Sequence, residues 1–209
     1  MLLRAEDYGH PLSSCTRKVL ITAAEKAVAI DVVPVDLLGG EHKRPAYLAL
    51  HPFGVIPVLD DDGYVVFESR AIIRYLDARL PGTSLVPGAP RARARMDQWL
   101  SVDQSYVAPH LQVLVGQRIV RKHQGQPIDA VAAHTAESAL GDSLAVIDRA
   151  LAGDAYLAGD AFSLADVSLM PYIAALAMVE ASHLRGDLRH LNRWWDAVSA
   201  RASWQAATA

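Results

Sequence analysis

The sequence predicts an α/β domain followed by an all-α helical domain, and two observations support this prediction. The first eighty residues alternate short apolar runs with helical patterns, which indicates a small mixed sheet flanked by helices. Beyond the segment LPGTSLVPGAP only helical patterns occur. That segment holds three prolines and two glycines in eleven residues, which is typical of a linker. The expected boundaries are residues 1–80 for the first domain, 81–90 for the linker and 91–209 for the helical domain.

The strands expected in the first domain are short. The segment MLLRA is expected to form the first strand, and AIDVVPVDL the second. Pro34, inside the second segment, has no backbone N–H to donate to a sheet, so this strand is expected at an edge or to be irregular there. The segment PVLDDDGYVVF predicts a hairpin whose turn is Asp61-Asp62-Gly63.

Two helices are expected beside these strands. After Ser13 and Ser14, apolar residues recur at helical spacing between Val19 and Val28, with the apolar face toward a core. A serine before such a run is a natural N-cap, because its side-chain oxygen accepts an N–H of the first turn. A second apolar stripe at helical spacing follows Glu68.

The second domain divides into helical blocks. The apolar periodicity places them at residues 91–107, 109–123, 128–151, 164–179 and 191–202. Ser163 and Asp166 occupy the positions of a capping box before the fourth block, with Asp where Glu or Gln is usual. The sequence therefore predicts that this helix begins directly after Ser163.

Composition and charge exclude several classes of protein. With 209 residues, of which 52% are hydrophobic, the chain is long enough to bury a core. The net charge of −3 provides no basic surface for nucleic acid or an anionic membrane, and no apolar span of about 20 residues occurs. The start MLLRAEDYGH has no apolar signal region. The single cysteine cannot form an internal disulfide and is consistent with a reducing, cytoplasmic location.

Three segments of the first domain carry residues suited to a ligand. In HPFGVIPVL, Pro57 stands between apolar residues, where a cis peptide bond can free the preceding backbone groups. In FESRAIIRYL, Glu68 and Ser69 open a helix, whose first N–H groups suit a carboxylate. In GGEHKRP, His42 and Lys43 can hold a second carboxylate. Two anion sites beside an extended backbone describe a receptor for a small peptide with a carboxylate at each end.

Together these motifs resemble the cytosolic glutathione transferases, and most of all the phi class. The pattern runs through YGHPLSSCTRKVL, VPVDLLGGEHKRPAYLALHPFGVIPVL and FESRAIIRYL. In the second half, WLSVDQSYVAP keeps a phi-like spacing, and YLAGDAFSLADVSLMPYI is similar to the C-terminal signature of these transferases. The resemblance covers nearly the whole chain, and the SSC triplet adds some similarity to the zeta class.

The resemblance implies a thioredoxin-like N-terminal domain that binds glutathione, an all-α C-terminal domain, and a small-molecule electrophile site between them. Glutathione is then the co-substrate. By motif, Ser13 matches the serine that stabilises the thiolate. The remaining matches are His42 and Lys43 near the glycyl carboxylate, Ile56 and the cis Pro57 at the cysteinyl backbone, and Glu68 and Ser69 at the γ-glutamyl group.

Two positions depart from the family pattern. The usual Asn before Pro-Phe-Gly is His51 here, and Val55 replaces a residue that is often Gln or Lys. An aliphatic side chain at Val55 cannot contact the peptide through a polar group. The sequence therefore predicts weaker glutathione binding than the rest of the motif suggests.

Three possible nucleophiles stand in a row at Ser13, Ser14 and Cys15. A free thiol has a pKa of about 8.5, so glutathione needs activation near neutral pH. We interpret Ser13 as a hydroxyl donor to the bound thiolate; the alternative is an N-cap alone. Ser14 either shares this role or caps the helix. Cys15 is interpreted as a structural thiol, because cysteine-type members of this superfamily carry their cysteine at the position of Ser13.

Other functions and roles stay open on the sequence alone. The main hypothesis is conjugation of glutathione to an electrophile; alternatives are a maleylacetoacetate-type isomerase, a glutathione peroxidase and a non-catalytic transferase-like module. The resemblance predicts a homodimer, and Phe53, an aromatic residue in a loop rich in Pro and Gly, could dock into the helical domain of a second copy. The alternative is that Phe53 packs in its own core. Tyr106 belongs either to the core or to an electrophile pocket. The histidines show no metal-ligand spacing, so no metal site is predicted.

Overall fold

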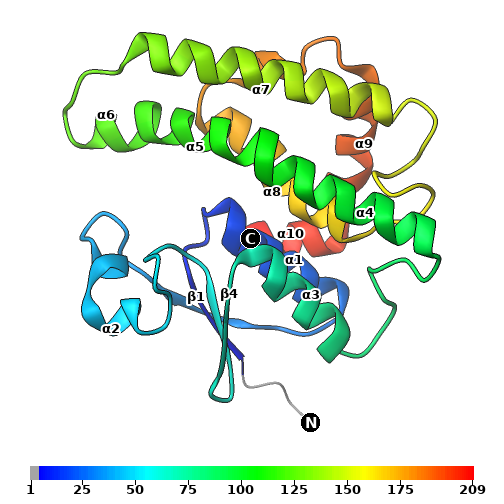
Figure 1. The fold of residues 1–209 in the computed structure, drawn as a ribbon, viewed down its shortest axis with the longest axis horizontal. Helices are drawn as coiled ribbons and strands as arrows, with labels where there is room; N and C mark the ends of the chain where they lie inside the picture. The colour runs from blue at the N-terminus through cyan, green and yellow to red at the C-terminus, as the bar shows by residue number, and fades with distance from the viewer. Residues whose placement is uncertain (1–4) are drawn as a thin grey trace. The chain divides into compact units, whose positions relative to one another are not determined.

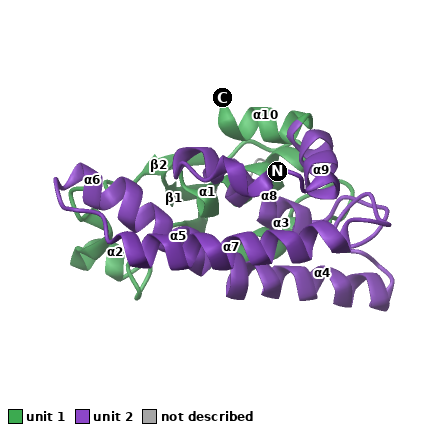
Figure 2. Cartoon of the chain, turned by 90° about the horizontal axis from the view of Figure 1, so that it is seen from above, with its two compact units in different colours: residues 1–86, 200–209 green, residues 87–199 purple. Residues whose placement is uncertain are grey.

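The structure, a computed structural model, describes residues 5–209. By internal contacts the chain divides into two compact units, shown in different colours in Figure 2. Unit 1 consists of residues 5–86 together with residues 200–209, and unit 2 of residues 87–199. Unit 1 contains the sheet and unit 2 is helical, so the α/β plus all-α fold class predicted from the sequence is confirmed.

The sheet of unit 1 has four short strands in the order β2-β1-β3-β4. They are β1 (Ala5–Gly9), β2 (Asp31–Pro34), β3 (Val58–Asp61) and β4 (Tyr64–Phe67). β1 and β2 are parallel, whereas β1 with β3 and β3 with β4 are antiparallel. Pro34 lies in an edge strand, as predicted, and the β3–β4 hairpin is also confirmed. The expected first strand MLLRA lies outside the described residues except for Ala5, where β1 begins.

Helices cover both faces of this sheet (Figure 1). On one face, α1 (Ser14–Glu25) and α3 (Ser69–Arg79) pack on β3 through a cluster that includes Val19, Leu59 and Ile72. On the other face lie a 3-10 turn, η1 (Glu41–Lys43), and the short helix α2 (Pro45–Leu48). This βαβ-ββα order is the thioredoxin-like fold that the resemblance implies.

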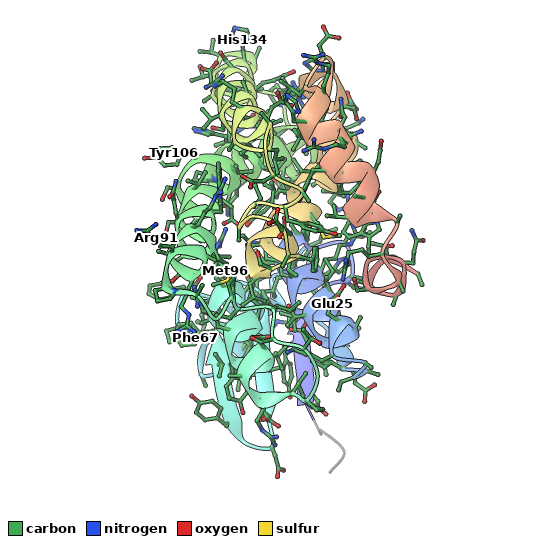
Figure 3. All side chains as sticks on the ribbon, turned by 90° about the vertical axis from the view of Figure 1, so that its right-hand side faces the viewer. Glu25, Phe67, Arg91, Met96, Tyr106 and His134 are labelled. Carbon is green, nitrogen blue, oxygen red and sulfur yellow. The ribbon has the colours of Figure 1, made fainter. Side chains whose placement is uncertain are left out.

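The last helix of the chain, α10 (Ala202–Thr208), packs against α1 within unit 1. The Glu25 carboxylate, labelled in Figure 3, accepts two hydrogen bonds of 2.8 Å from the Arg201 guanidinium and one from the Ser203 hydroxyl. The guanidinium carbon of Arg17 lies 5.9 Å from the ring centre of Trp204. Charge-assisted contacts and a cation–π contact therefore fix the chain end to α1.

Unit 2 is helical, and its first helices follow one another directly. α4 (Pro90–Val102), α5 (Ala108–Val115) and α6 (Arg121–His123) are linked by π-helical turns, η2 (Asp103–Val107) and η3 (Gly116–Val120). The first two expected blocks therefore form one nearly continuous helical run through Pro109. Proline is tolerated there because it occupies the first turn after a π-helical turn, where the regular hydrogen-bond pattern is already shifted.

The other helices of unit 2 are α7 (Ala130–Ala150), α8 (Leu164–Met178), the 3-10 turn η4 (Ser182–Arg185) and α9 (Arg189–Ser199); α7 runs alongside α5 (Figure 1). The predicted capping box begins α8: the Ser163 hydroxyl accepts the Ala165 N–H, and Asp166 accepts the Ser163 N–H. Asp166, which is fully buried, also accepts the indole N–H of Trp194 at 2.8 Å. The short Asp166 side chain thus joins α8 to α9, which gives a structural reason for Asp at the capping-box position where Glu or Gln is usual.

Candidate functional site

The predicted site residues gather at the edge of the sheet where β1 and β4 end and β3 begins, because the strand register brings these strand ends together. Tyr8 pairs with Val58, and Val58 pairs with Phe67. The loop after β1, the entrance to β3 and the exit from β4 therefore lie on neighbouring strands, which are about 4.8 Å apart. These are the segments that contain Ser13, Pro57 and Glu68. The helices α1 and α3 both begin at this edge, so their positive ends face the same region.

Ser13 is the N-cap of α1, with extended backbone angles of φ −71° and ψ 126°. Its side-chain oxygen accepts the Thr16 N–H at 3.4 Å, a long hydrogen bond. A serine hydroxyl can accept with its lone pairs and donate its own proton at the same time. The two interpretations of Ser13, helix cap and hydroxyl donor, are therefore compatible.

The loop before Ser13 is held by local hydrogen bonds. The backbone N–H of His10 donates to the Thr16 hydroxyl at 3.2 Å, and the Ser13 N–H donates to the His10 carbonyl at 2.8 Å. The Arg17 side chain donates to the Pro11 carbonyl at 2.9 Å. Side chains from the first turn of α1 thus fix the approach to Ser13.

The Ile56–Pro57 peptide bond is cis, as predicted from the sequence. The segment before it is held from η1 and α2. The Lys43 ammonium donates to the carbonyls of Phe53 at 3.1 Å and Gly54 at 2.6 Å. The Tyr47 hydroxyl donates to the Val55 carbonyl at 2.8 Å. Three consecutive carbonyls before Ile56 therefore accept hydrogen bonds from two side chains.

Gly54 is required by this close approach. Its φ is +58°, and a Cβ atom at this position would lie 2.6 Å from the His42 carbonyl oxygen and 2.9 Å from a Leu48 methyl carbon. Any other residue would push η1 and α2 away from the segment that they hold. The glycine of the Pro-Phe-Gly motif thus has a packing reason in this structure.

Glu68 and Ser69 stand where β4 ends and α3 begins. Glu68 is the N-cap residue with φ 72° and ψ 109°, a conformation that is uncommon for a residue with a side chain. Its side chain makes no capping hydrogen bond, and its carbonyl accepts the N–H groups of Ala71 and Ile72. Ser69, the first residue of α3, is buried. Strained backbone of this kind costs about 1–3 kcal/mol and is concentrated at ligand sites.

His42 and Lys43 form the last two residues of η1. Burial, followed by the charge of Lys43, lowers the pKa of His42, so its ring is neutral at pH 7. The His42 Nδ1 atom is buried and lacks a hydrogen-bond partner among the described residues. Lys43 uses two of its three N–H donors on backbone carbonyls, which leaves one for a ligand carboxylate.

The two positions that depart from the expected pattern differ in exposure. His51 is buried and its ring lies 4.6 Å from that of Phe67, and burial lowers its pKa. It therefore fills an apolar space as a neutral ring. Val55 is exposed, and because its side chain is aliphatic it adds no polar contact at the edge of the sheet. Phe53 is 70% exposed, which makes the own-core interpretation of this residue wrong.

Comparison with known proteins agrees with this geometry. The family model described as "Glutathione S-transferase, N-terminal domain" matches residues 12–79, and the model described as "Glutathione S-transferase, C-terminal domain" matches residues 103–202. The chain belongs to the glutathione S-transferase family. It is therefore an enzyme of the transferase class whose co-substrate is glutathione.

Relatives and solved structures extend this similarity over the whole transferase chain. Glutathione S-transferase F10 of Arabidopsis thaliana is 37% identical, covering 95% of this chain and 94% of the relative. Glutathione S-transferase 3 of Zea mays is 38% identical, covering 97% of this chain and 92% of the relative. The crystal structure of glutathione transferase F7 from Populus trichocarpa has a TM-score of 0.89 at 33% identity, covering 97% of both chains. The F-series names agree with the phi class expected from the motifs.

Sequence reasoning missed one functional contribution in this transferase. Tyr47 appeared only within the quoted motif and Lys43 only as a carboxylate contact, whereas both hold the segment before Ile56. The tyrosine in the six-residue segment PAYLAL had no polar or charged neighbour within that segment to mark it, and only the folded geometry brings its hydroxyl to Val55. Ser14 is the first residue of α1 and, like Cys15, is half-buried.

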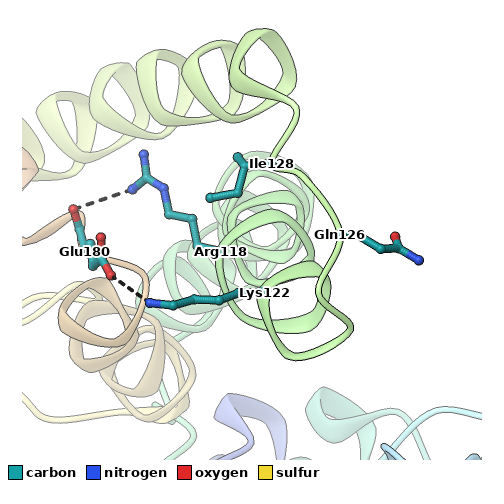
Figure 4. Close-up of a pocket in the computed structure, with 5 residues that line it drawn as sticks. All are labelled: Arg118, Lys122, Gln126, Ile128 and Glu180. Carbon is teal, nitrogen blue, oxygen red and sulfur yellow. Dashed lines mark hydrogen bonds and ion pairs between the residues drawn. The ribbon is translucent and has the colours of Figure 1, made fainter.

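Unit 2 of the transferase carries a separate pocket of about 320 Å³, lined by Arg118, Lys122, Gln126, Ile128 and Glu180 (Figure 4). Its charges are already compensated: Arg118 pairs with Glu137 and donates to the Val179 carbonyl, and Lys122 lies 4.0 Å from Glu180. None of the motif residues lines it. Tyr106, on η2, is 59% exposed and its side chain points away from the helix in Figure 3, so the core interpretation is wrong.

The described part of the transferase contains neither a metal-binding cluster nor a membrane-spanning helix. Among residues 5–209, no group of three or more His, Cys, Asp or Glu side chains is arranged to hold a metal ion. Over the same residues, no helix is both long enough and apolar enough to cross a bilayer.

Proposed function

We propose that this chain conjugates glutathione to small electrophiles by using the Ser13 hydroxyl to stabilise the glutathione thiolate. The sulfur attacks an electrophilic carbon, a C–S bond forms, and the leaving group departs with the bonding electrons or the electrons move into a conjugated carbonyl. The thiol proton passes to solvent when the thiolate forms. A donor aimed at the sulfur stabilises the thiolate and lowers the thiol pKa.

The position of Ser13 at the start of α1 is the observation that carries this proposal. Its oxygen already accepts the Thr16 N–H, which polarises the hydroxyl and leaves its proton to donate. The helix of twelve residues behind it places a partial positive charge at the same point. A thiolate there gains from both the hydroxyl and the helix end.

The rest of the tripeptide extends along the same edge of the sheet. In this proposal the γ-glutamyl carboxylate binds at Glu68 and Ser69, where α3 begins and the backbone is strained. The backbone of Ile56, before cis Pro57, pairs with the cysteinyl residue. The glycyl carboxylate accepts from the remaining donor of Lys43 and from the buried Nδ1 side of the His42 ring. The unpartnered His42 nitrogen supports this last contact.

A halogenated aromatic ring and an unsaturated carbonyl are the electrophile classes that suit a thiolate. One structural neighbour, maize glutathione S-transferase I, was solved in complex with an atrazine glutathione conjugate; its TM-score is 0.87 at 26% identity. A chlorinated heteroaromatic is therefore a reasonable electrophile for this chain. In that reaction the C–Cl bond breaks and chloride leaves. Detoxification of such compounds is the physiological role that we propose.

We also propose a homodimer in the cytoplasm. The exposed aromatic ring of Phe53 supports the dimer, since a ring of this size on a loop fixed by Lys43 is suited to a pocket on a second copy. The cytoplasmic location is supported by the single, half-buried cysteine, which needs no oxidising compartment.

Two measurements on the purified protein test the proposed reaction. Glutathione should raise the melting temperature as its concentration passes the dissociation constant, up to about 10 mM. A panel of chlorodinitrobenzene, a chlorotriazine, maleylacetoacetate and cumene hydroperoxide should show conjugation with the first two. Absence of both thermal stabilisation and conjugation contradicts the proposal, whereas turnover of maleylacetoacetate or the hydroperoxide alone would identify an isomerase or a peroxidase.

A further inference from the structure

The side chain of Tyr47 occupies an unusual place for a phenol. It lies in α2 and is only 5% exposed, yet its hydroxyl finds an acceptor, the Val55 carbonyl, at 2.8 Å. Its ring belongs to the buried cluster with Val35 and Val58, and Ile56 packs against that same cluster. Burial, and then the charges of Asp7 and Glu41, raise the pKa of Tyr47, so its hydroxyl stays protonated and acts as a donor.

The accepting carbonyl is part of the peptide group that also contains the Ile56 N–H. A peptide group is planar, and in the trans form its C=O and N–H point in opposite directions. The one cis bond found in residues 5–209 is the next one, Ile56–Pro57, so the Val55–Ile56 bond is trans. A hydrogen bond that fixes the Val55 oxygen therefore also fixes the direction in which the Ile56 N–H points.

We propose that Tyr47 is a positioning residue for glutathione, because its bond to Val55 orients the Ile56 backbone that pairs with the cysteinyl part of the tripeptide. This inference rests on the proposed function. Lys43 holds the two preceding carbonyls, so the three side-chain contacts together orient three successive peptide groups. Tyr47 holds the last of these, directly beside the binding backbone. Ser13 and the two carboxylate sites do not depend on it.

The substitution Tyr47→Phe tests this role, because it removes the hydroxyl and keeps the ring in the Val35–Val58 cluster. A typical hydrogen bond contributes a factor of about 5 to an equilibrium constant. We expect the KM and the Kd for glutathione to rise about 3- to 10-fold. We expect no comparable change in the chemical step, since Ser13 is unchanged. The kcat at saturating glutathione and the KM for chlorodinitrobenzene should stay within about 2-fold of wild type, and the pKa of the bound thiol within about 0.3 units.

Tyr75→Phe is the matched control. The Tyr75 hydroxyl donates to the Asp61 carboxylate at 2.5 Å, in the same unit but at the opposite end of β3 from Ile56. This variant should leave the KM for glutathione unchanged. Melting temperatures and circular dichroism of both variants confirm that each is folded.

Each outcome has one interpretation. A Tyr47→Phe variant with the wild-type KM for glutathione overturns the positioning role while leaving the proposed function intact. An equal rise in KM for Tyr47→Phe and Tyr75→Phe also overturns it, because the effect would then be general loosening of unit 1. A wild-type protein without glutathione binding or thiolate absorbance would instead contradict the proposed function itself.

Discussion

The oxygen of Ser13 accepts a hydrogen bond from the backbone N–H of Thr16 at 3.4 Å. The Ser13 hydroxyl therefore has two roles in this proposal. It caps α1 by accepting the Thr16 N–H, and it has a proton left to donate to the glutathione thiolate. Removal of the hydroxyl therefore has two consequences, a small one for stability and a larger one for the thiolate. The two can be measured separately.

Ser13→Ala should raise the pKa of bound glutathione and lower the conjugation rate near neutral pH by on the order of 100-fold, as for loss of one oxyanion-type donor. The loss of the cap should cost about 1 kcal/mol of stability. Glutathione affinity should change less, since the carboxylate contacts remain. The pH–rate profile of conjugation and the thiolate absorbance of the binary complex measure the first effect, and thermal unfolding measures the second.

Ser14→Ala and Cys15→Ala are the neighbouring controls for this experiment. Ser14→Ala should cost much less activity, and Cys15→Ala should leave conjugation nearly intact. If Cys15→Ala abolished activity while Ser13→Ala did not, the assignment would be wrong. The protein would then be a cysteine-type thiol transferase that works through a mixed disulfide.

Asp7 should make unit 1 less stable as the pH rises. It is fully buried in β1, its carboxyl oxygens lack hydrogen-bond partners among the described residues, and burial raises its pKa to about 8. The native state keeps this proton while the unfolded state loses it above about pH 4, so stability falls as the pH rises through this window toward about 8. Asp7→Val should raise the melting temperature at about pH 8 and flatten its decline from about pH 5.

Asp31→Val, at an exposed position of the edge strand β2, is the control for Asp7 and should leave the pH dependence unchanged. A lower melting temperature for Asp7→Val at about pH 8 would contradict the prediction. It would mean that the carboxylate is ionised and compensated by a cation such as Lys18, which is also buried, on the adjacent helix α1.

Glu25→Gln should weaken the packing of α10 against α1. Burial opposes ionisation of Glu25, but hydrogen bonds from Arg201 and Ser203 outweigh it and lower the pKa. The contact thus stabilises the fold above the usual glutamate range and is lost as the pH falls through the lowered pKa. Backbone amides of residues 202–208 should exchange with deuterium several-fold faster in the variant, as expected for about 1 kcal/mol. Asp154→Asn, which removes the Arg95 ion pair in unit 2, should leave that exchange unchanged.

Phe53→Ala should weaken the proposed homodimer. A buried aromatic anchor typically costs about 2 kcal/mol or more on truncation, so the dimer dissociation constant should rise by on the order of 10-fold or more. Light scattering over a dilution series measures this change, with the monomer mass of 22.6 kDa as the reference. Leu38→Ala, at an apolar residue of unit 1 with similar exposure (65% against 70% for Phe53), should have no effect. A wild-type protein that is monomeric at micromolar concentration would refute the dimer.

Local signals made much of this fold predictable. Pro34 indicates an edge strand because its nitrogen cannot donate, and Asp62-Gly63 gives the hairpin turn because both residues adopt positive φ. Ser163 and Asp166 mark a helix start by their spacing alone. Such features depend on neighbours within four residues, so the sequence displays them directly. The proposed site was reached through motif resemblance, and the register of Tyr8, Val58 and Phe67 explains why those motifs meet.

Contacts between distant residues were not predictable in the same way. The Tyr47 hydroxyl reaches Val55 only because α2 folds onto the sheet, and no pattern of residue types encodes that approach. The π-helical turns on either side of α5 were likewise not predictable from helical periodicity, which suggested a break before Pro109 instead.

The hydrogen bonds between Glu25 and Arg201 also have a consequence for folding during synthesis. The sheet and α1 leave the ribosome early, but α10, which covers α1, is synthesised more than a hundred residues later. A nascent chain therefore holds an incomplete first unit, with the α10-binding side of α1 uncovered, during synthesis of all the helices of unit 2. Unit 1 is complete only when residues 202–208 emerge, so we expect a fusion partner placed next to this segment to affect the folding of unit 1 rather than that of unit 2.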